Sequence, residues 1–430
     1  MTSPLSALPR WFRQLPQLSR GQAFWLLASI AVAFLAGSIA PTPLYAVYQA
    51  QWGFSPITVT VVFGIYALAV LAALLTAGSL SDHVGRRPVL FVATLLQAVV
   101  MLLFSNASGV SSLVVARIVQ GLATGAAVGA VGAGMLDLDR AKGTIANAVA
   151  PITGTATGGL VSGLMVQYLP APTHLVYLVL FAIFVVQAIA IPLMPESSPR
   201  KPGALASLRP QFRLPRVARQ PLLFAAPALV AAWALPGFYG SLGPTLVRRL
   251  AGSTSLALGG VAIFVLAGSA AVTVLFSRQR SPRTLLSFGT AALLVGVGVS
   301  LLAIAHTFTS DAGASLALFL AGTALAGAGF GGGFQGAIRI VLPLAAPHER
   351  AGVLSVLYVI SYLAMGLPAV IAGVLVVHGH GGLMTTAREY GLGVMALAAI
   401  AFGGVVFRTE RAVPRVPAPA VHQSERLGLS

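Results

Sequence analysis

The sequence contains no cysteine and very little charge. Only 8% of its 430 residues are Asp, Glu, Lys or Arg, and only nine residues are acidic. Without cysteine there are no disulfides, thiol nucleophiles or zinc–thiolate sites. A soluble chain of this length needs many more charged side chains to cover its surface. The scarcity of charge therefore argues against an ordinary soluble domain.

Apolar residues take the place of the missing charge. They make up 57% of the chain, and the mean hydropathy is +0.90. The apolar runs are about 20 residues long or longer, which is the length of a membrane-spanning helix and about twice that of a barrel strand. We therefore predict an all-α integral membrane protein.

Twelve spans are expected, most of them joined by short connections. The predicted ranges are 22–46, 57–80, 88–106, 112–136, 143–168, 173–195, 220–247, 254–277, 284–307, 313–340, 350–377 and 390–408. The first run is too long for a signal peptide. The expected units are a tail (1–21), a six-helix bundle (22–195), a linker rich in Pro, Ser and Arg (196–219), a second six-helix bundle (220–408) and a second tail (409–430).

The positions of Lys and Arg indicate the orientation in the membrane. If both termini face the cytoplasm, 22 of the 26 basic residues lie in cytoplasmic segments and only three lie outside. Arg248 and Arg249 are an outside pair that this rule does not explain. We predict a multi-pass protein of the cell inner membrane, surrounded by lipid, with both termini cytoplasmic. The net charge of +17 forms no single patch with interleaved aromatics, so a nucleic-acid partner is not expected.

An internal repeat relates the two halves of the chain. Asp139-Arg140-Ala141 follows the fourth span, and Glu349-Arg350-Ala351 follows the tenth. Two such halves in the same orientation predict a pseudo-two-fold axis along the membrane normal. The loop after the eighth span, 277–285, keeps arginines but lacks the acid and the glycines of the loop after the second span.

The loop after the second span is the most distinctive polar stretch. Its key residues are Gly78, Asp82, Gly85, Arg86, Arg87 and Pro88. Gly78 allows another helix to approach closely, Gly85 permits a tight turn, and Asp82 is stabilised near a helix N-terminus. The arginines could pair with Asp137 or Asp139 at the inner end of the fourth span. A simple positive-inside anchor would explain the arginines, but not the acid and the glycines at these spacings.

This loop resembles the signature of the major facilitator superfamily between spans 2 and 3. In the fourth span, Arg117-Ile118-Val119-Gln120-Gly121 is similar to a second signature found in the drug-efflux branches of that superfamily. The resemblance covers nearly the whole chain and implies alternating access by two six-helix bundles. It also implies that the loop meets the eleventh span when the cytoplasmic side closes. The fifth span departs from the efflux pattern, because Thr155 stands where many exporters have proline.

Arg117 is the only charged residue clearly inside an apolar run. Such a residue normally faces the bundle interior or a water-filled cavity. It could contact substrate or take part in proton coupling. Alternatively, it could be a structural arginine bonded to carbonyls of a broken neighbouring helix, with the region of Pro41 and Pro43 as the source of those carbonyls.

The substrate cavity is expected to lack a buried acid. None of the nine acids falls in the middle of a span, and the histidines lie in loops, tails or span ends. A cavity of this kind favours neutral or anionic compounds. The resemblance implies that spans 1, 4, 7 and 10 line the cavity. The candidate substrate-binding residues on these spans are Arg117, Gln120, Trp233, Phe238, Phe330, Phe334 and Gln335.

We predict a monomeric secondary transporter that exports small organic compounds, such as drug-like molecules, sugars or metabolites, in exchange for protons. The resemblance is to twelve-span drug and sugar efflux permeases of the drug:proton antiporter type. No cofactor or metal is expected, and no nucleophile–base pair or metal-ligand cluster indicates an enzyme. The alternatives are an uptake permease or uncoupled facilitator, and a non-transporting membrane sensor or assembly protein.

Overall fold

The computed structural model describes residues 17–210, 212, 214–306, 311–346 and 348–406. Within these ranges the chain forms helices and no β-strand. The long helices of the first half are α2 (Arg20–Ile39), α4 (Pro56–Ala77), α6 (Arg86–Ser105), α7 (Val110–Leu138), α8 (Arg140–Tyr168) and α9 (Pro172–Ala190). Those of the second half are α11 (Arg216–Ser241), α13 (Ala257–Phe276), α14 (Pro282–His306), α15 (Ala312–Val341), α16 (Arg350–His378) and α17 (Gly382–Val406).

Short helices connect or extend the long ones. They are α3 (Tyr45–Trp52), α5 (Ser81–Val84), α10 (Ala204–Ser207) and α12 (Gly243–Leu250), with 3-10 turns η2 (Ile191–Leu193) and η3 (Leu342–Leu344). Eleven of the long helices described here are long and apolar enough to cross a membrane. The twelfth, α17, has 25 residues, and Arg388 and Glu389 make its N-terminal half less apolar. The all-α architecture predicted from composition is confirmed.

Two of the predicted spans are broken, so their expected boundaries are wrong. The first span, expected over 22–46, ends as α2 at Ile39, and α3 begins only at Tyr45. Pro41 and Pro43 occupy the gap, because proline lacks the N–H that an α-helix requires and its ring clashes with the preceding turn. The seventh span, expected over 220–247, breaks at Leu242, and Pro244 lies in the first turn of α12.

The second break places Arg248 and Arg249 on a short helix of their own. Arg248 and Arg249 lie in the last turn of α12, opposite the buried side chains of Leu246, Val247 and Leu250. The short helix is therefore amphipathic and separate from the membrane span. Basic side chains are also favoured at a helix C-terminus, where the backbone carbonyls carry partial negative charge. Local helix electrostatics therefore favour two basic side chains at the end of α12.

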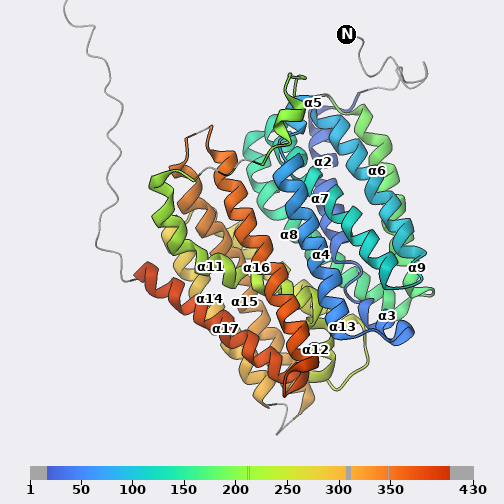
Figure 1. The fold of residues 1–430 in the computed structure, drawn as a ribbon, viewed down its shortest axis with the longest axis vertical. Coiled ribbons are helices and arrows are strands. Elements are labelled where there is room, and N and C mark those ends of the chain that lie inside the picture. Colours follow the sequence, from blue (N-terminus) through green and yellow to red (C-terminus); the bar gives the residue numbers. More distant parts are fainter. Residues whose placement is uncertain (1–16, 211, 213, 307–310, 347, 407–430) are drawn as a thin grey trace, which may run out of the picture.

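The long helices pack as two bundles side by side (Figure 1). In the first bundle α6 packs on α7 and α9, and α2 packs on α7 and α8. In the second bundle α14 packs on α15 and α17, and α11 packs on α15 and α16. Two pairs of helices form the seam between the bundles, α8 against α13 and α4 against α16.

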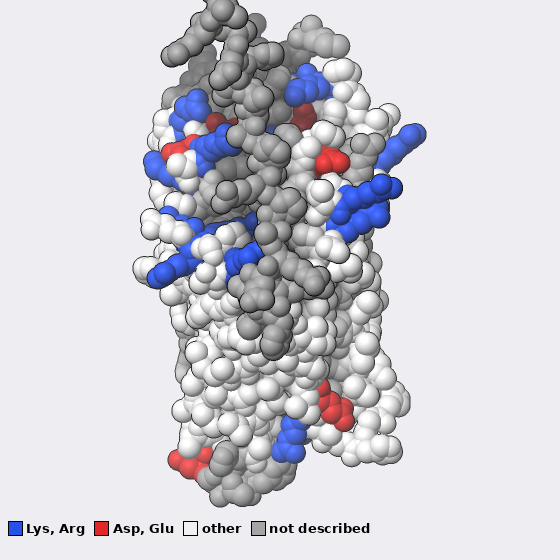
Figure 2. Space-filling model, turned by 90° about the vertical axis from the view of Figure 1, so that its left-hand side faces the viewer, with Lys and Arg blue, Asp and Glu red and all other residues white. Residues whose placement is uncertain are grey.

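Charge marks one end of the molecule. Figure 2 shows Lys and Arg side chains gathered above a broad uncharged band, at the end where Figure 1 places α5. The linker after the first bundle also lies at this end, and hydrogen bonds join it to the loop after α4. The Lys201 N–H donates to the His83 carbonyl (2.8 Å), and Ser79 Oγ donates to the Ser207 carbonyl (3.1 Å). We refer to this end as the basic end.

Candidate functional site

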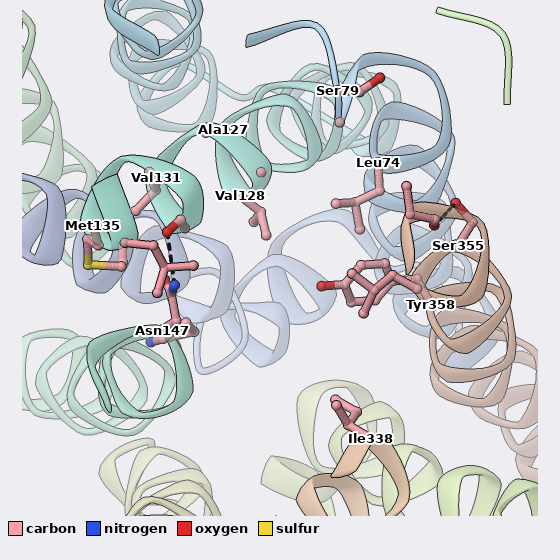
Figure 3. Close-up of a pocket in the computed structure, with 18 of the residues that line it drawn as sticks. Leu74, Ser79, Ala127, Val128, Val131, Met135, Asn147, Ile338, Ser355 and Tyr358 are labelled. Carbon is pink, nitrogen blue, oxygen red and sulfur yellow. Dashed lines mark hydrogen bonds between the residues drawn. The ribbon is translucent and has the colours of Figure 1, made fainter. Parts of the chain in front are cut away.

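A central cavity of about 640 Å³ lies between the two bundles. Residues of α2, α4, α7 and α8 line it from the first bundle, and residues of α15 and α16 line it from the second. Gly78, Ser79 and Asp82 belong to its wall, so the cavity reaches the basic end. Figure 3 shows α7 facing α15 and α16 across this space.

Most of the cavity wall is apolar, with a few polar groups. Asn147 Nδ2 donates to the Gly132 carbonyl (2.9 Å), and Ser355 Oγ donates to the Ala351 carbonyl (3.0 Å). The Tyr358 hydroxyl points into the open space (Figure 3). Among the described residues that line the cavity, only Asp82 and Arg209 carry charge. A wall of this kind suits an uncharged or weakly charged organic molecule.

The bundles meet at the end opposite the basic end. Thr42 Oγ1, in the break between α2 and α3, donates to the Gly240 carbonyl near the end of α11 (3.1 Å). Near the first turn of α4, Thr60 faces Gly373 of α16 so closely that a Cβ on the glycine would overlap Thr60 Oγ1. These contacts close the far end while the basic end stays open.

Three of the predicted aromatic residues come together. Trp233 packs edge-on against Phe330 and Phe334, with ring centroids 5.9 and 5.2 Å away, and the Tyr362 ring centroid lies 5.4 Å away. The Tyr362 ring also contacts that of Tyr358, with centroids 6.5 Å apart, so this aromatic cluster adjoins the cavity wall. Trp233 Nε1 is buried and has no hydrogen-bond partner among the described residues.

The other predicted binding residues are placed separately. Gln335 lines the central cavity. Phe238 instead packs against Tyr390, with ring centroids 4.9 Å apart, inside the second bundle. Sequence reasoning missed Asn147, Ser355 and Tyr358. Asn147 and Tyr358 lie on spans 5 and 11, which the resemblance did not assign to the cavity.

Arg117 and Gln120 form a closed cluster with the break in the first span. Arg117 is fully buried and donates to the Ser38 carbonyl (2.6 Å), to Gln120 Oε1 (2.7 Å) and to the Tyr45 hydroxyl (2.6 and 3.0 Å). Gln120 Nε2 donates to the Gly37 carbonyl (3.0 Å). Helix α2 ends at Ile39, so these carbonyls lack their usual helical partners.

Three aromatic rings complete the surroundings of Arg117. The rings of Tyr66, Phe104 and Tyr45 have their centroids 5.2 to 5.7 Å from the guanidinium carbon, at cation–π distance. Neither Arg117 nor Gln120 lines the central cavity in this conformation. This geometry supports the structural alternative for Arg117, in which it bonds the carbonyls of a broken neighbouring helix.

The loop after α4 forms an ion-pair network at the basic end. The Arg86 guanidinium pairs with Asp82 and with Asp137, whose Oδ2 lies 3.4 Å from Arg86 Nε. It also donates to Ser81 Oγ (2.7 Å). Asp139 takes another role, because it caps α8 by accepting from the Lys142 N–H (3.0 Å). This bond lowers the pKa of Asp139.

Arg87 does not join that network. Its guanidinium donates to the Pro192 carbonyl. Its backbone N–H, like that of Arg86, donates to the carboxylate of Glu196 (3.1 and 2.8 Å). Glu196 thus caps the N-terminus of α6, a role that sequence reasoning did not assign. The sequence did contain an indication of this role. Glu196 directly follows the sixth predicted span, at the same end of the spans as the basic loops after the second and fourth spans.

Gly85 is required by both its conformation and its surroundings. Its φ is +100°, a region that side chains other than glycine rarely adopt. A Cβ on Gly85 would also lie 2.7 Å from Glu196 Oε2. Gly78 is approached closely by α7 in this conformation. A Cβ on Gly129, which belongs to α7, would lie 2.5 Å from the Gly78 carbonyl oxygen.

Comparison with known proteins agrees with this architecture. The sequence profile of the Major Facilitator Superfamily matches residues 25–309. No curated protein matches the chain. A bacterial homolog of the human lysosomal transporter Spinster, in an inward-facing and unoccupied conformation, superposes with a TM-score of 0.72 at 13% identity over 92% of this chain and 99% of that one.

A second similar structure is that of a mutant form of the nucleoside transporter NupG. It has a TM-score of 0.68 at 11% identity and covers 89% of this chain and 99% of that one. At these identities the likeness concerns the fold alone. The family match, the helical architecture and the cavity between two bundles lead to one conclusion: this chain belongs to the major facilitator superfamily and is a multi-pass membrane transporter of small molecules, not an enzyme.

Proposed function

We propose that this transporter exports small organic compounds, neutral or anionic, from the cytoplasm by alternating access. The observation that supports this most is the central cavity, which is open at the basic end and closed at the other. By the positive-inside rule we take the basic end as cytoplasmic, so both termini are proposed to lie inside and the conformation is proposed to be inward-open. The domain boundaries 22–195 and 220–408 are proposed with this topology, in the cell inner membrane.

Recognition is proposed to depend on the cavity wall and the aromatic cluster next to it. Tyr358, Gln335 and Asn147 supply hydrogen-bonding groups, and Trp233 Nε1 is a buried donor that a bound molecule can use. Leaving such a donor without a partner is costly, so a substrate acceptor that reaches it gains affinity. Because Asp82 is the only acid on the described wall, lipophilic cations are disfavoured.

Proton antiport is proposed from the resemblance of Arg117, Gln120 and Gly121 to the efflux signature. The described part of the chain contains no buried carboxylate, and this observation favours the rival, an uptake permease or uncoupled facilitator. The two are separated in inverted membrane vesicles with an imposed pH gradient. An antiporter accumulates substrate only while the gradient lasts. Accumulation that survives collapse of the gradient would overturn proton antiport.

The substrate itself is sought by a susceptibility and metabolite-export screen on a deletion strain. With a substrate in hand, Tyr358→Phe and Gln335→Ala are expected to raise KM about threefold to tenfold, since each removes one hydrogen bond. Leu325→Ala on the exposed face of α15 is the matched control and leaves KM unchanged. If Tyr358→Phe and Gln335→Ala leave KM as unchanged as the control does, the binding site lies elsewhere. If the screen finds no substrate, and Asp82→Asn and Arg117→Ala change no phenotype of the cell, the non-transporting alternative is favoured.

A further inference from the structure

A second cavity, of about 360 Å³, lies at the seam between the bundles. One wall comes from the N-terminal part of α8 and includes Thr144 and Val149. The facing wall comes from the end of α13, the loop after it and α15, and includes Arg278, Arg280 and Arg339. Thr144 also lines the central cavity, so the two cavities are neighbours at the basic end.

Backbone carbonyls hold two of these guanidinium groups in place. Arg339 Nη1 donates to the carbonyls of Arg278 (3.2 Å) and Ser277 (3.4 Å), and Arg278 Nε donates to the Leu275 carbonyl (2.8 Å). Each guanidinium carries five N–H donors, so most donors remain for another acceptor. The arginine side of the cavity is therefore partly organised.

The arginines in corresponding loops of the two halves differ in whether a carboxylate pairs with them. In the first half, Asp82 and Asp137 neutralise Arg86. In the second half, the loop over 277–285 contains no acid. Among the described residues, no carboxylate pairs with Arg278, Arg280 or Arg339. Three cations around one small cavity repel one another, and a bound anion would relieve that repulsion.

The rest of the wall indicates what kind of anion fits. Val149 and Val274 of the wall are apolar. Phe276 does not line the cavity, but it lies two residues after Val274 at the end of α13 and has 81% of its surface exposed. Its arginines lie at the ends of membrane helices, because Arg278 and Arg280 closely follow the end of α13 and Arg339 lies in the last turn of α15. Phospholipid phosphates occupy that level of a membrane, and basic pockets between spans on the cytoplasmic side bind anionic headgroups.

We propose that this seam cavity binds the headgroup phosphate of an anionic phospholipid, with its acyl chains against the apolar surface at Phe276. Its walls belong to different bundles, α8 to the first and α13 and α15 to the second. A headgroup held between them stabilises the conformation in which these walls face each other. Anionic lipid therefore favours the state described here, open at the basic end.

The test measures lipid retention by the purified full-length chain with native mass spectrometry, using phosphatidylglycerol against phosphatidylcholine. The unaltered chain is expected to retain phosphatidylglycerol preferentially. The triple variant R278Q/R280Q/R339Q should retain about tenfold less. R216Q/R219Q/R283Q removes three charges from the same end but outside the cavity, and it should change retention by less than about twofold.

A second variant keeps every charge. Val149→Phe fills the cavity from the α8 wall and should also reduce retention, which separates a built site from general attraction to a basic surface. Equal retention of both lipids by the unaltered chain would overturn the proposal. So would equal losses in the cavity and control triple variants, or a thermal stabilisation by millimolar inorganic phosphate that matches that of phosphatidylglycerol.

Discussion

Arg86 Nε lies 3.4 Å from an Asp137 oxygen, while the same guanidinium pairs with Asp82. Arg86 is only 8% exposed although it begins a membrane helix. One buried cation thus ties α5 to the end of α7. Removing either carboxylate would leave a buried charge with half of its compensation.

Asp137→Asn is expected to lower the free energy of unfolding by about 1 kcal/mol, a modest value because the Asp137 side chain is partly exposed to solvent. Asp139→Asn, two residues along, is the matched control. Asparagine still caps α8, so its effect should be close to zero. Thermal unfolding in detergent measures both. If Asp139→Asn lowers the stability as much as Asp137→Asn does, the pairing of Arg86 with Asp137 does not account for the effect.

Arg117→Ala is expected to destabilise the protein by about 3 kcal/mol or more. It leaves the Tyr45 hydroxyl and the Ser38 carbonyl without their partner and opens a void in the bundle. Arg117→Lys should lower the free energy of unfolding by less than Arg117→Ala, because it keeps the charge. It should still be destabilising, because lysine lacks the forked donors of arginine. Ile118→Ala, on the exposed side of α7, is the control. A stable Arg117→Ala chain that folds but no longer transports would instead favour the substrate-contact or proton-coupling role.

Gly85→Ala and Gly53→Ala separate backbone strain from crowding. Both glycines have positive φ, +100° and +66°, but only Gly85 faces a close neighbour. A Cβ there displaces Glu196 and uncaps α6, so Gly85→Ala should cost about 1 kcal/mol more than Gly53→Ala. Thermal unfolding in detergent gives the comparison. In a Glu196→Ala background the part of this difference that comes from crowding should disappear, while the part that comes from the Gly85 backbone, at φ +100° and ψ 154°, should remain.

Gly373→Ala should open the closed end of the transporter, because its methyl group would clash with Thr60. Gly268→Ala is the control, since a Cβ there meets nothing within 4 Å. Because the chain has no cysteine, cysteines introduced at Val128 and Ser355, across the central cavity, would be the only sites for a pair of spin labels. The population with a short Val128–Ser355 distance should grow in Gly373→Ala only. An unchanged distance distribution would exclude this contact as part of the seal.

The loop after α4 could be anticipated from local pattern, but most of the cavity wall could not, and the misses have a physical cause. The spacing of Asp82, Gly85 and Arg86 pointed to a structured loop because turns and helix termini are local. The choice of Asp137 over Asp139 depends on how the end of α7 is turned toward α6, and the sequence does not contain that rotation. Tyr358 and Asn147 were missed for the same reason, since an apolar helix does not indicate which face meets the cavity.

By itself, the sequence determined that this is an all-α membrane protein of two related halves, because span length, hydropathy and basic loops are set by the thickness and polarity of a bilayer. Only the tertiary structure decided that Arg117 closes the break in the first span, that Glu196 caps α6, and that Arg278, Arg280 and Arg339 surround a cavity. These roles join residues far apart in the chain. They depend on how helices rotate and cross, which many weak packing contacts decide together.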